Sequence, residues 1–179
     1  MERSSKPVSA SHSIMTELVL PNDTNGLGNL MGGRLLHWMD VCAAVSSQRH
    51  SGSICVTASV DSVEFHSPIH QSEIVIVQSQ VNRAFRSSME IELRVDAENP
   101  RTGSKRRCNS AFYTFVAVGS DGKPKVVPLV IPESDEQRIR YKEAERRRNF
   151  RLFLAGRLDS DGVQSLSDYI DAMKDARTS

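Results

Sequence analysis

The sequence has few cysteines, and none of them forms a metal-binding or disulfide pattern. Three occur in 179 residues, at positions 42, 55 and 108, and no C-x-x-C pair is present. An odd number of widely spaced cysteines argues against the disulfide frameworks of small secreted domains and against zinc sites. We therefore expect free thiols, no metal site and a reducing, cytoplasmic location.

Long apolar runs and an excess of one charge are also missing. No stretch approaches the roughly 20 apolar residues of a membrane span, and no signal-peptide core follows the N-terminus. The 23 Lys and Arg residues nearly balance the 22 Asp and Glu residues, which leaves a formal charge of +1. This balance creates no global field toward nucleic acid or a lipid surface, so we expect neither as a partner.

The remaining composition is that of an ordinary globular protein, with 39% apolar and 25% charged residues. A chain of this length can bury roughly 70% of its unfolded surface and so form a real core. Changes in composition along the chain divide it into three parts. We place a disordered polar N-terminus at 1–11, one folded domain at 12–132 and a charged helical tail at 133–179.

Hydrophobic periodicity predicts one long helix and five strands in the folded domain. The helix is expected over about 31–48, where apolar residues recur at helical spacing before a Ser-Gly pair. The strands are expected at 13–21, 54–66, 72–85, 87–97 and 106–118. This order predicts an α+β domain in which a five-stranded antiparallel sheet packs on the helix.

The tail beyond residue 132 is charged almost throughout at first and then becomes a second helical stretch at about 163–176. A run of three arginines, Arg146 to Arg148, follows Glu143 and Glu145, so the simplest interpretation is a solvated helix face. An RNA-contact surface is the alternative. The absence of aromatic stacking motifs counts against it.

The long helix carries an acidic residue on its apolar side. Asp40 lies four residues after Leu36 and three before Ala43, so the three share one helix face. A carboxylate removed from water without a partner costs several kcal/mol. Two interpretations stay open: Asp40 has a chemical function, or the helix rolls so that Asp40 pairs with a backbone group or with Arg34.

A loop rich in glycine and asparagine precedes this helix and ends in Gly32 and Gly33. A glycine pair at a helix start leaves backbone N–H groups open to a ligand oxygen. Asn25 adds an amide that can orient or polarise a carbonyl. Together with Asp40, these residues predict a site in which a carbonyl is held at the helix start while a carboxylate activates water.

A single chain is not expected to complete this site. Seven residues separate Gly33 from Asp40, and the corresponding helix rise is about 10 Å, too far for both to act on one carbonyl carbon. If two copies pair with antiparallel helices, the loop of one faces the second helical turn of the other. The sequence therefore predicts two composite sites in a two-fold dimer.

Basic residues gather at two later positions. Arg86, Ser87 and Ser88 occupy a turn between two strands, and Arg101 and residues 105–107 lie near the next strand. Such groups bind phosphates through charge-assisted hydrogen bonds. Basic residues at turns are also often merely solvated, and the residues alone leave both interpretations open.

Other candidate groups lack the pattern that their chemistry requires. Ser46, Ser47 and His50 are not in a G-x-S-x-G turn, and His66 and His70 have no further ligand at metal-binding spacing. The glycines before the long helix match neither the phosphate-loop nor the dinucleotide fingerprint, so we expect no nucleotide cofactor.

The stretch PNDTNGLGNLMGGRLLHWMD resembles the signature of hotdog-fold acyl-CoA thioesterases, in the group of brain acyl-CoA hydrolase and the bacterial YciA-type enzymes. The shared pattern is D-x-N-x-x-G-x-x-x-G-G followed by a helix with Met-Asp. The resemblance continues through VTASVDSVEFHSPI, RSSMEIELRV and SAFYTFVAV and covers about residues 12–132. The last 28 residues or so match no part of the family pattern.

The resemblance implies a hotdog fold and the hydrolysis of acyl-CoA to free CoA and a carboxylic acid, with no cofactor besides the CoA of the substrate. In such enzymes the loop Asn and the helix Asp act from opposite hotdog units, and by match these are Asn25 and Asp40. The turn at Arg86, Ser87 and Ser88 is expected near the CoA moiety. Family members are dimers at least and often hexamers built as trimers of dimers, so this chain is expected to self-associate.

On this interpretation the thioester carbonyl sits near Gly32 and Gly33, Asn25 positions it or the water, and Asp40 of the partner chain is the general base. Direct attack by Asp40 is the alternative mechanism. The alternative function is a non-enzymatic acyl-CoA sensor on the same fold. Retention of both Asn25 and Asp40 disfavours a sensor, because binding alone requires no buried carboxylate beside the acyl carbonyl.

Overall fold

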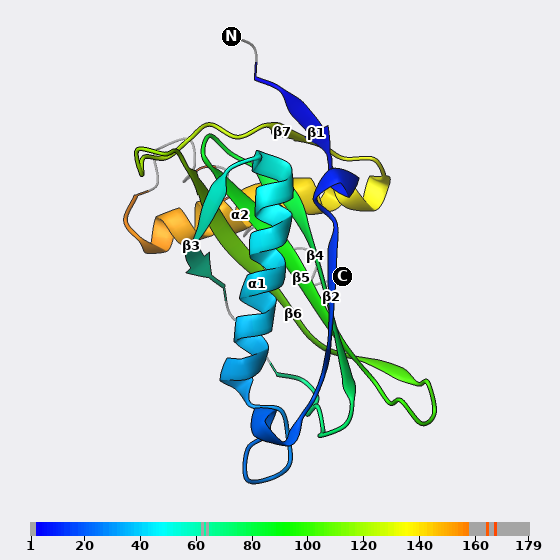
Figure 1. Ribbon diagram of the computed structural model, residues 1–179. Coiled ribbons are helices and arrows are strands. Elements are labelled where there is room, and N and C mark those ends of the chain that lie inside the picture. The colour runs from blue at the N-terminus through cyan, green and yellow to red at the C-terminus, as the bar shows by residue number, and fades with distance from the viewer. Residues whose placement is uncertain (1–2, 62, 64, 158–163, 165–166, 168–179) are drawn as a thin grey trace. The chain divides into compact units, whose positions relative to one another are not determined.

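A five-stranded antiparallel sheet curls around one long helix in the first of the two units of the chain (Figure 1). The computed structural model describes residues 3–61, 63, 65–157, 164 and 167. The chain divides into a unit Met1–Glu133 and a unit Ser134–Ser179. No helix within these described residues has the length and apolar character needed to cross a membrane.

The described residues of the first unit form the long helix, seven strands and two short 3-10 turns. In chain order these are β1 (Ser5–Pro7), η1 (Val8–Ser11), β2 (Ser13–Leu18), η2 (Pro21–Asp23), α1 (Gly32–Ser51), β3 (Ile54–Val60), β4 (Ile74–Ala84), β5 (Ser88–Glu98), β6 (Lys105–Val118) and β7 (Leu129–Ile131). The large sheet has the order β2-β4-β5-β6-β3, and every neighbouring pair is antiparallel. The prediction of an α+β hotdog domain is confirmed.

Helix α1 is the centre of the core. It ends where Gly52 adopts the left-handed conformation, with φ of 63°, and donates its N–H to the carbonyl of Gln48 at 2.8 Å. Its buried residues recur every three or four positions: Leu35, Trp38, Met39, Cys42, Ala43, Ser46, Ser47 and His50. This stripe faces the concave side of the sheet, which includes Met89, Ile91, Leu93 and Val95 of β5, all fully buried.

The polar N-terminus is ordered from Ser5 to Ser11, although the sequence placed it in a disordered segment. Strand β1 pairs in parallel with β7 in a small second sheet. Ser11 is fully buried, and its hydroxyl donates to the carbonyl of Val8 at 2.7 Å and accepts from the N–H of Val81 at 2.9 Å. These contacts replace the water that a frayed terminus would otherwise bind.

The second unit contains helix α2 (Asp135–Leu154), which confirms the predicted charged helix at the start of the tail. Ser134 caps it by accepting a hydrogen bond from the N–H of Gln137 at 3.2 Å. Asp135 and Glu136 in the first turn complement the positive end of the helix dipole. The second predicted tail helix, at 163–176, lies outside the described residues except for positions 164 and 167.

Candidate active site

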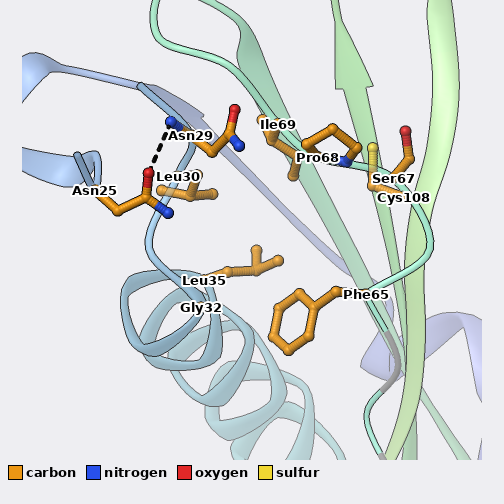
Figure 2. Close-up of a pocket in the computed structure, with 10 residues that line it drawn as sticks. All are labelled: Asn25, Asn29, Leu30, Gly32, Leu35, Phe65, Ser67, Pro68, Ile69 and Cys108. Carbon is orange, nitrogen blue, oxygen red and sulfur yellow. Dashed lines mark hydrogen bonds between the residues drawn. The ribbon is translucent and has the colours of Figure 1, made fainter. Parts of the chain in front are cut away.

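The loop that carries Asn25 is a tight turn closed by its own side chain. The Oδ1 atom of Asn25 accepts from the N–H groups of Leu27 at 2.9 Å and Asn29 at 3.3 Å, and the second bond is drawn in Figure 2. The backbone N–H of Asn25 donates to the carbonyl of Asn29 at 2.8 Å. Because the oxygen of the amide is used within the loop, its NH2 group is the end that is available to a ligand.

The start of α1 is open, as the glycine pair predicts. Met31, at the N-cap, supplies no side-chain hydrogen bond, and no acceptor takes the N–H groups of Gly32 and Gly33 in the described part of the chain. Asp23, at the end of η2, holds the first turn of α1, because its Oδ1 accepts a hydrogen bond from Nε of Arg34 at 2.8 Å. Two unpaired amides at a helix start favour a ligand oxygen that carries negative charge.

A cavity of about 390 Å³ lies beside the loop and the helix start (Figure 2). Its lining is mostly apolar and consists of Asn25, Asn29, Leu30, Gly32, Leu35, Phe65, Ser67, Pro68, Ile69 and Cys108. The ring of Phe65 approaches Gly32 closely: an added Cβ would lie 3.3 Å from Cζ of that ring, so the ring would have to shift by a few tenths of an ångström. Burial raises the pKa of Cys108, so its thiol remains protonated and is a poor nucleophile.

Asp40 lies half-buried on α1 and is held by a residue of β3. The hydroxyl of Thr57 donates to Oδ1 of Asp40 at 2.7 Å. The ring of Tyr113 is buried nearby, and burial together with the charge of Asp40 raises the pKa of Tyr113 to about 12. The suggested pairing of Asp40 with Arg34 does not occur, because Arg34 binds Asp23 instead.

The predicted site residues fall at three places in one chain. Asn25, Gly32 and Gly33 meet at the start of α1, and Asp40 lies two helical turns further along. The turn at Arg86–Ser88 is near the opposite end of the helix: Ser88 pairs with Val116 of β6, which pairs with Val56 of β3, just after α1 ends (Figure 1). A single chain therefore does not bring the turn to the helix start.

The turn between β4 and β5 is firmly held by its backbone. The carbonyl of Arg86 accepts from the N–H of Val127 at 3.1 Å, and that of Ser87 accepts from Ala117 at 2.9 Å. The side chain of Arg86 is exposed, so it is available to an anionic ligand. Three other basic residues considered for phosphate binding form ion pairs with carboxylates of the same chain. These pairs are Lys105–Glu98, Arg106–Glu73 and Arg107–Asp96.

The weaker candidates have structural contacts. The hydroxyl of Ser46 lies 2.6 Å from that of Ser79, and Nε2 of the fully buried His50 lies 2.9 Å from the carbonyl oxygen of Pro128. Burial lowers the pKa of His50, which favours its neutral form. Among the described residues, no three His, Cys, Asp or Glu side chains are placed to hold a metal ion.

Two residues of this region were missed in the sequence. Thr57 lies in a predicted strand, and no sequence motif around it indicates a function. Its hydrogen bond to Asp40 forms only because the fold places β3 next to α1. Phe65 follows the β3 segment and forms part of the cavity lining against Gly32. The glycine pair was itself a signal for such a close approach, but it did not identify the partner.

Several known proteins with similar sequences are named acyl-CoA thioester hydrolases. A family model of the thioesterase superfamily matches residues 27–104. The uncharacterized acyl-CoA thioester hydrolase YkhA of Bacillus subtilis is 40% identical over 141 residues, which are 79% of this chain and 82% of the relative. The cytosolic acyl coenzyme A thioester hydrolase of mouse is 35% identical over 142 residues, which are 78% of this chain but only 37% of the mouse protein.

Solved structures agree in fold and sequence. The crystal structure of an apo-hexameric acyl-CoA thioesterase has a TM-score of 0.82 at 40% identity and covers 85% of this chain and 97% of its own. The acyl-CoA hydrolase of Staphylococcus aureus was solved with butyryl coenzyme A, coenzyme A and coenzyme A disulfide. It has a TM-score of 0.78 at 32% identity and covers 91% of this chain and 99% of its own.

A curled antiparallel sheet around one central helix, with an open helix start beside an apolar cavity, defines a protein of the hotdog class. The chain belongs to the thioesterase superfamily, and within it to the group of acyl-CoA thioester hydrolases that includes YkhA and the cytosolic mouse protein.

Proposed function

We propose that this protein is an acyl-CoA thioesterase, which hydrolyses acyl-CoA to free CoA and a carboxylic acid. The observation that carries the proposal is the helix start, where two unpaired N–H groups and the free end of the Asn25 amide adjoin a mostly apolar cavity. A carbonyl oxygen gains negative charge when water attacks a thioester, and such donors stabilise that charge. The names of the related hydrolases support the same reaction.

In the proposed reaction, Asp40 of the partner chain removes a proton from a water molecule, whose oxygen then bonds to the thioester carbon. The carbonyl oxygen becomes an oxyanion near Gly32 and Gly33, with Asn25 donating to it or to the water. The C–S bond then breaks, and the CoA sulfur leaves as a thiol after receiving the proton. Thr57 orients the carboxylate of Asp40 through its 2.7 Å hydrogen bond.

Self-association is part of this proposal. Strand β3 is an edge of the sheet, and it presents three half-exposed or exposed apolar residues: Ile54, Val56 and Val60. Val41 and Val45 on α1 are similarly exposed and add to the apolar surface. Such a surface favours a partner, and a two-fold pairing would join the Asn25 loop of one chain to Asp40 of another. We propose a homodimer as the minimum unit, and a hexamer of three dimers by analogy with the hexameric relative.

The same pairing would bring the Arg86 turn of the partner to the helix start, because antiparallel helices place opposite ends together. We propose that Arg86, Ser87 and Ser88 bind a phosphate group of CoA there. The relative solved with coenzyme A supports a CoA site in this fold. We also propose a cytosolic location, in line with the name of the mouse relative.

The spacing of three residues supports their joint function. Structures of the Staphylococcus aureus hydrolase include three variants, with an asparagine, an aspartate or a threonine replaced by alanine. The first two positions are 15 residues apart, and the last two are 17 apart. Asn25, Asp40 and Thr57 have the same separations in this chain.

Replacing Thr57 with valine is expected to lower kcat about tenfold or more, because a hydrogen bond to a charged group is lost while the side-chain shape is kept. Steady-state kinetics on the best acyl-CoA substrate measures the effect. Thr57→Ser keeps the hydroxyl and serves as the matched control, with kcat within about threefold of the natural protein. Equal rates for the valine and serine variants would remove Thr57 from the mechanism.

A panel of acyl-CoAs of increasing chain length tests the function itself. We expect release of free thiol above the uncatalysed rate for at least one chain length, measured with a thiol reagent. The alternative function is an acyl-CoA sensor, which would bind members of the panel, as shown by calorimetry, and release no thiol. That result would refute the thioesterase proposal.

A further inference from the structure

A partly buried ion pair lies behind the wall of the cavity. Arg106 of β6 and Glu73, which precedes β4, form two parallel hydrogen bonds: Nη1 to Oε1 at 2.6 Å and Nη2 to Oε2 at 2.7 Å. The side chain of Glu73 is 10% exposed, and that of Arg106 is 36% exposed. This fork-to-fork geometry fixes orientation as well as distance, which a lysine could not do.

The remaining donors of Arg106 bind the cavity wall directly. Nη2 also donates to the carbonyl of Pro68 at 2.7 Å, and Nε donates to the hydroxyl of Ser67 at 3.3 Å. Ser67 and Pro68 both line the cavity, and Ile69 follows them. One guanidinium therefore holds both the carboxylate and the chain segment that forms this wall.

The wall segment is in turn joined to the Asn25 loop at three points. The N–H of Leu30 donates to the carbonyl of Ile69 at 2.7 Å, and the N–H of Gln71 donates to the carbonyl of Gly28 at 3.1 Å. Between them, Nδ1 of His70 lies 2.8 Å from Oδ1 of Asn29.

Glu73 connects the ion pair to these bonds. Its Oε2 accepts from the backbone N–H of His70 at 2.8 Å, so the carboxylate fixes the residue whose ring contacts Asn29. Asn29 closes the turn around Asn25 through its N–H and carbonyl groups. A continuous series of hydrogen bonds thus runs from Arg106 to Asn25.

We propose that Arg106 is a positioning residue for hydrolysis: through Glu73 and the segment Ser67–Gln71, it holds the Asn25 loop where the Asn25 amide meets the substrate. The inference rests on the proposed function, in which Asn25 contacts the thioester or the water. A loop displaced by about 1 Å at such a site costs about 100-fold in rate. The hydrogen bond to Arg106 also lowers the pKa of Glu73, which keeps this carboxylate ionised in the working protein.

The neighbouring arginine provides a matched control. Arg107 is also in β6 and forms an ion pair, with Nε 2.5 Å from Oδ1 of Asp96, but its side chain is 51% exposed. Its hydrogen bond goes to Asp96 on β5, whereas those of Arg106 reach the cavity wall. If the ion pairs only stabilise the fold, replacing either arginine should lower kcat. If Arg106 positions the loop, only its replacement should lower kcat.

The test compares Arg106→Met, Arg106→Lys and Arg107→Met in the full-length chain, each with and without Asn25→Ala. We expect Arg106→Met to lower kcat 10- to 100-fold with a change in KM of less than about threefold, and Arg107→Met to change neither more than about twofold. In the Asn25→Ala background, the loss caused by Arg106→Met should shrink to about threefold or less, because the misplaced amide is already absent. Equal losses in the two backgrounds would overturn the proposal.

Hydrogen exchange gives a measure that does not depend on activity. Amides of residues 26–31 should exchange faster in Arg106→Met than in the natural protein or in Arg107→Met, and unchanged exchange would overturn the proposal. If the methionine variant does not fold, Arg106→Lys keeps the charge and supplies the same comparison, and its loop amides should exchange faster than those of the natural protein and of Arg107→Met. If the natural chain hydrolyses no acyl-CoA, the proposed function fails, while the exchange result still decides whether Arg106 holds the loop.

Discussion

We expect the replacement of Asp40 with asparagine to lower kcat for acyl-CoA hydrolysis by about 100-fold or more and to leave the fold intact. Asparagine has nearly the shape of aspartate, and its carbonyl oxygen can still accept the hydrogen bond from Thr57. It cannot take a proton from water. Thiol release under saturating substrate measures the loss, and a thermal melt within a few degrees of the natural protein verifies the fold. Near-normal turnover would remove Asp40 from the mechanism.

One turnover in water labelled with ¹⁸O separates the two possible actions of Asp40. With Asp40 as general base, the oxygen added to the acid product comes from water, so the first product molecule is labelled. With Asp40 as nucleophile, an acyl-aspartyl anhydride forms; when water attacks the Asp40 carbonyl of that anhydride, the oxygen added to the acid comes from the carboxylate and the label enters the protein. Unlabelled acid and labelled Asp40 after one turnover on excess protein would therefore establish the nucleophilic route.

Mixing two inactive variants should restore about a quarter of the natural activity. In a dimer of one Asn25→Ala chain and one Asp40→Asn chain, one composite site carries both defects and the other carries neither. Random pairing makes about half of the dimers mixed, and each of these has one working site in two. The measurement is thiol release after co-expression of the two variants.

Each variant expressed alone is the control for this mixture, and each should retain about 1% of the activity or less. A site contained in one chain predicts a different outcome, because every chain in the mixture would carry one defect. Activity that stays at the level of the single variants would therefore exclude a composite site.

The large features of the fold followed from the sequence because they have strong periodic patterns. Helix α1 has an apolar stripe and a glycine at its end, and β5 alternates cleanly between apolar and charged residues. The three-residue strands β1 and β7 have no such pattern. Their pairing joins Ser5 to Leu129, residues far apart in the chain, and only the tertiary structure reveals it.

The site was predictable in its local part and not in its long-range part. Asn25, Gly32 and Gly33 lie within one short segment, so their chemistry could be read directly, and the open N–H groups are present as expected. Arg106 was grouped with possible phosphate ligands because Glu73, its partner, lies 33 residues earlier in the sequence. Charge alone does not show whether a basic residue faces a ligand or an internal carboxylate.

The turn around Asn25 fixes which end of the Asn25 amide faces a ligand at the helix start. Because Oδ1 of Asn25 is bonded to two backbone N–H groups of its own loop, the amide cannot rotate to present oxygen without breaking both bonds. The Asn25 NH2 group and the N–H groups of Gly32 and Gly33 then present hydrogen-bond donors together at this end of α1. A thioester oxygen, which only accepts, suits these three groups.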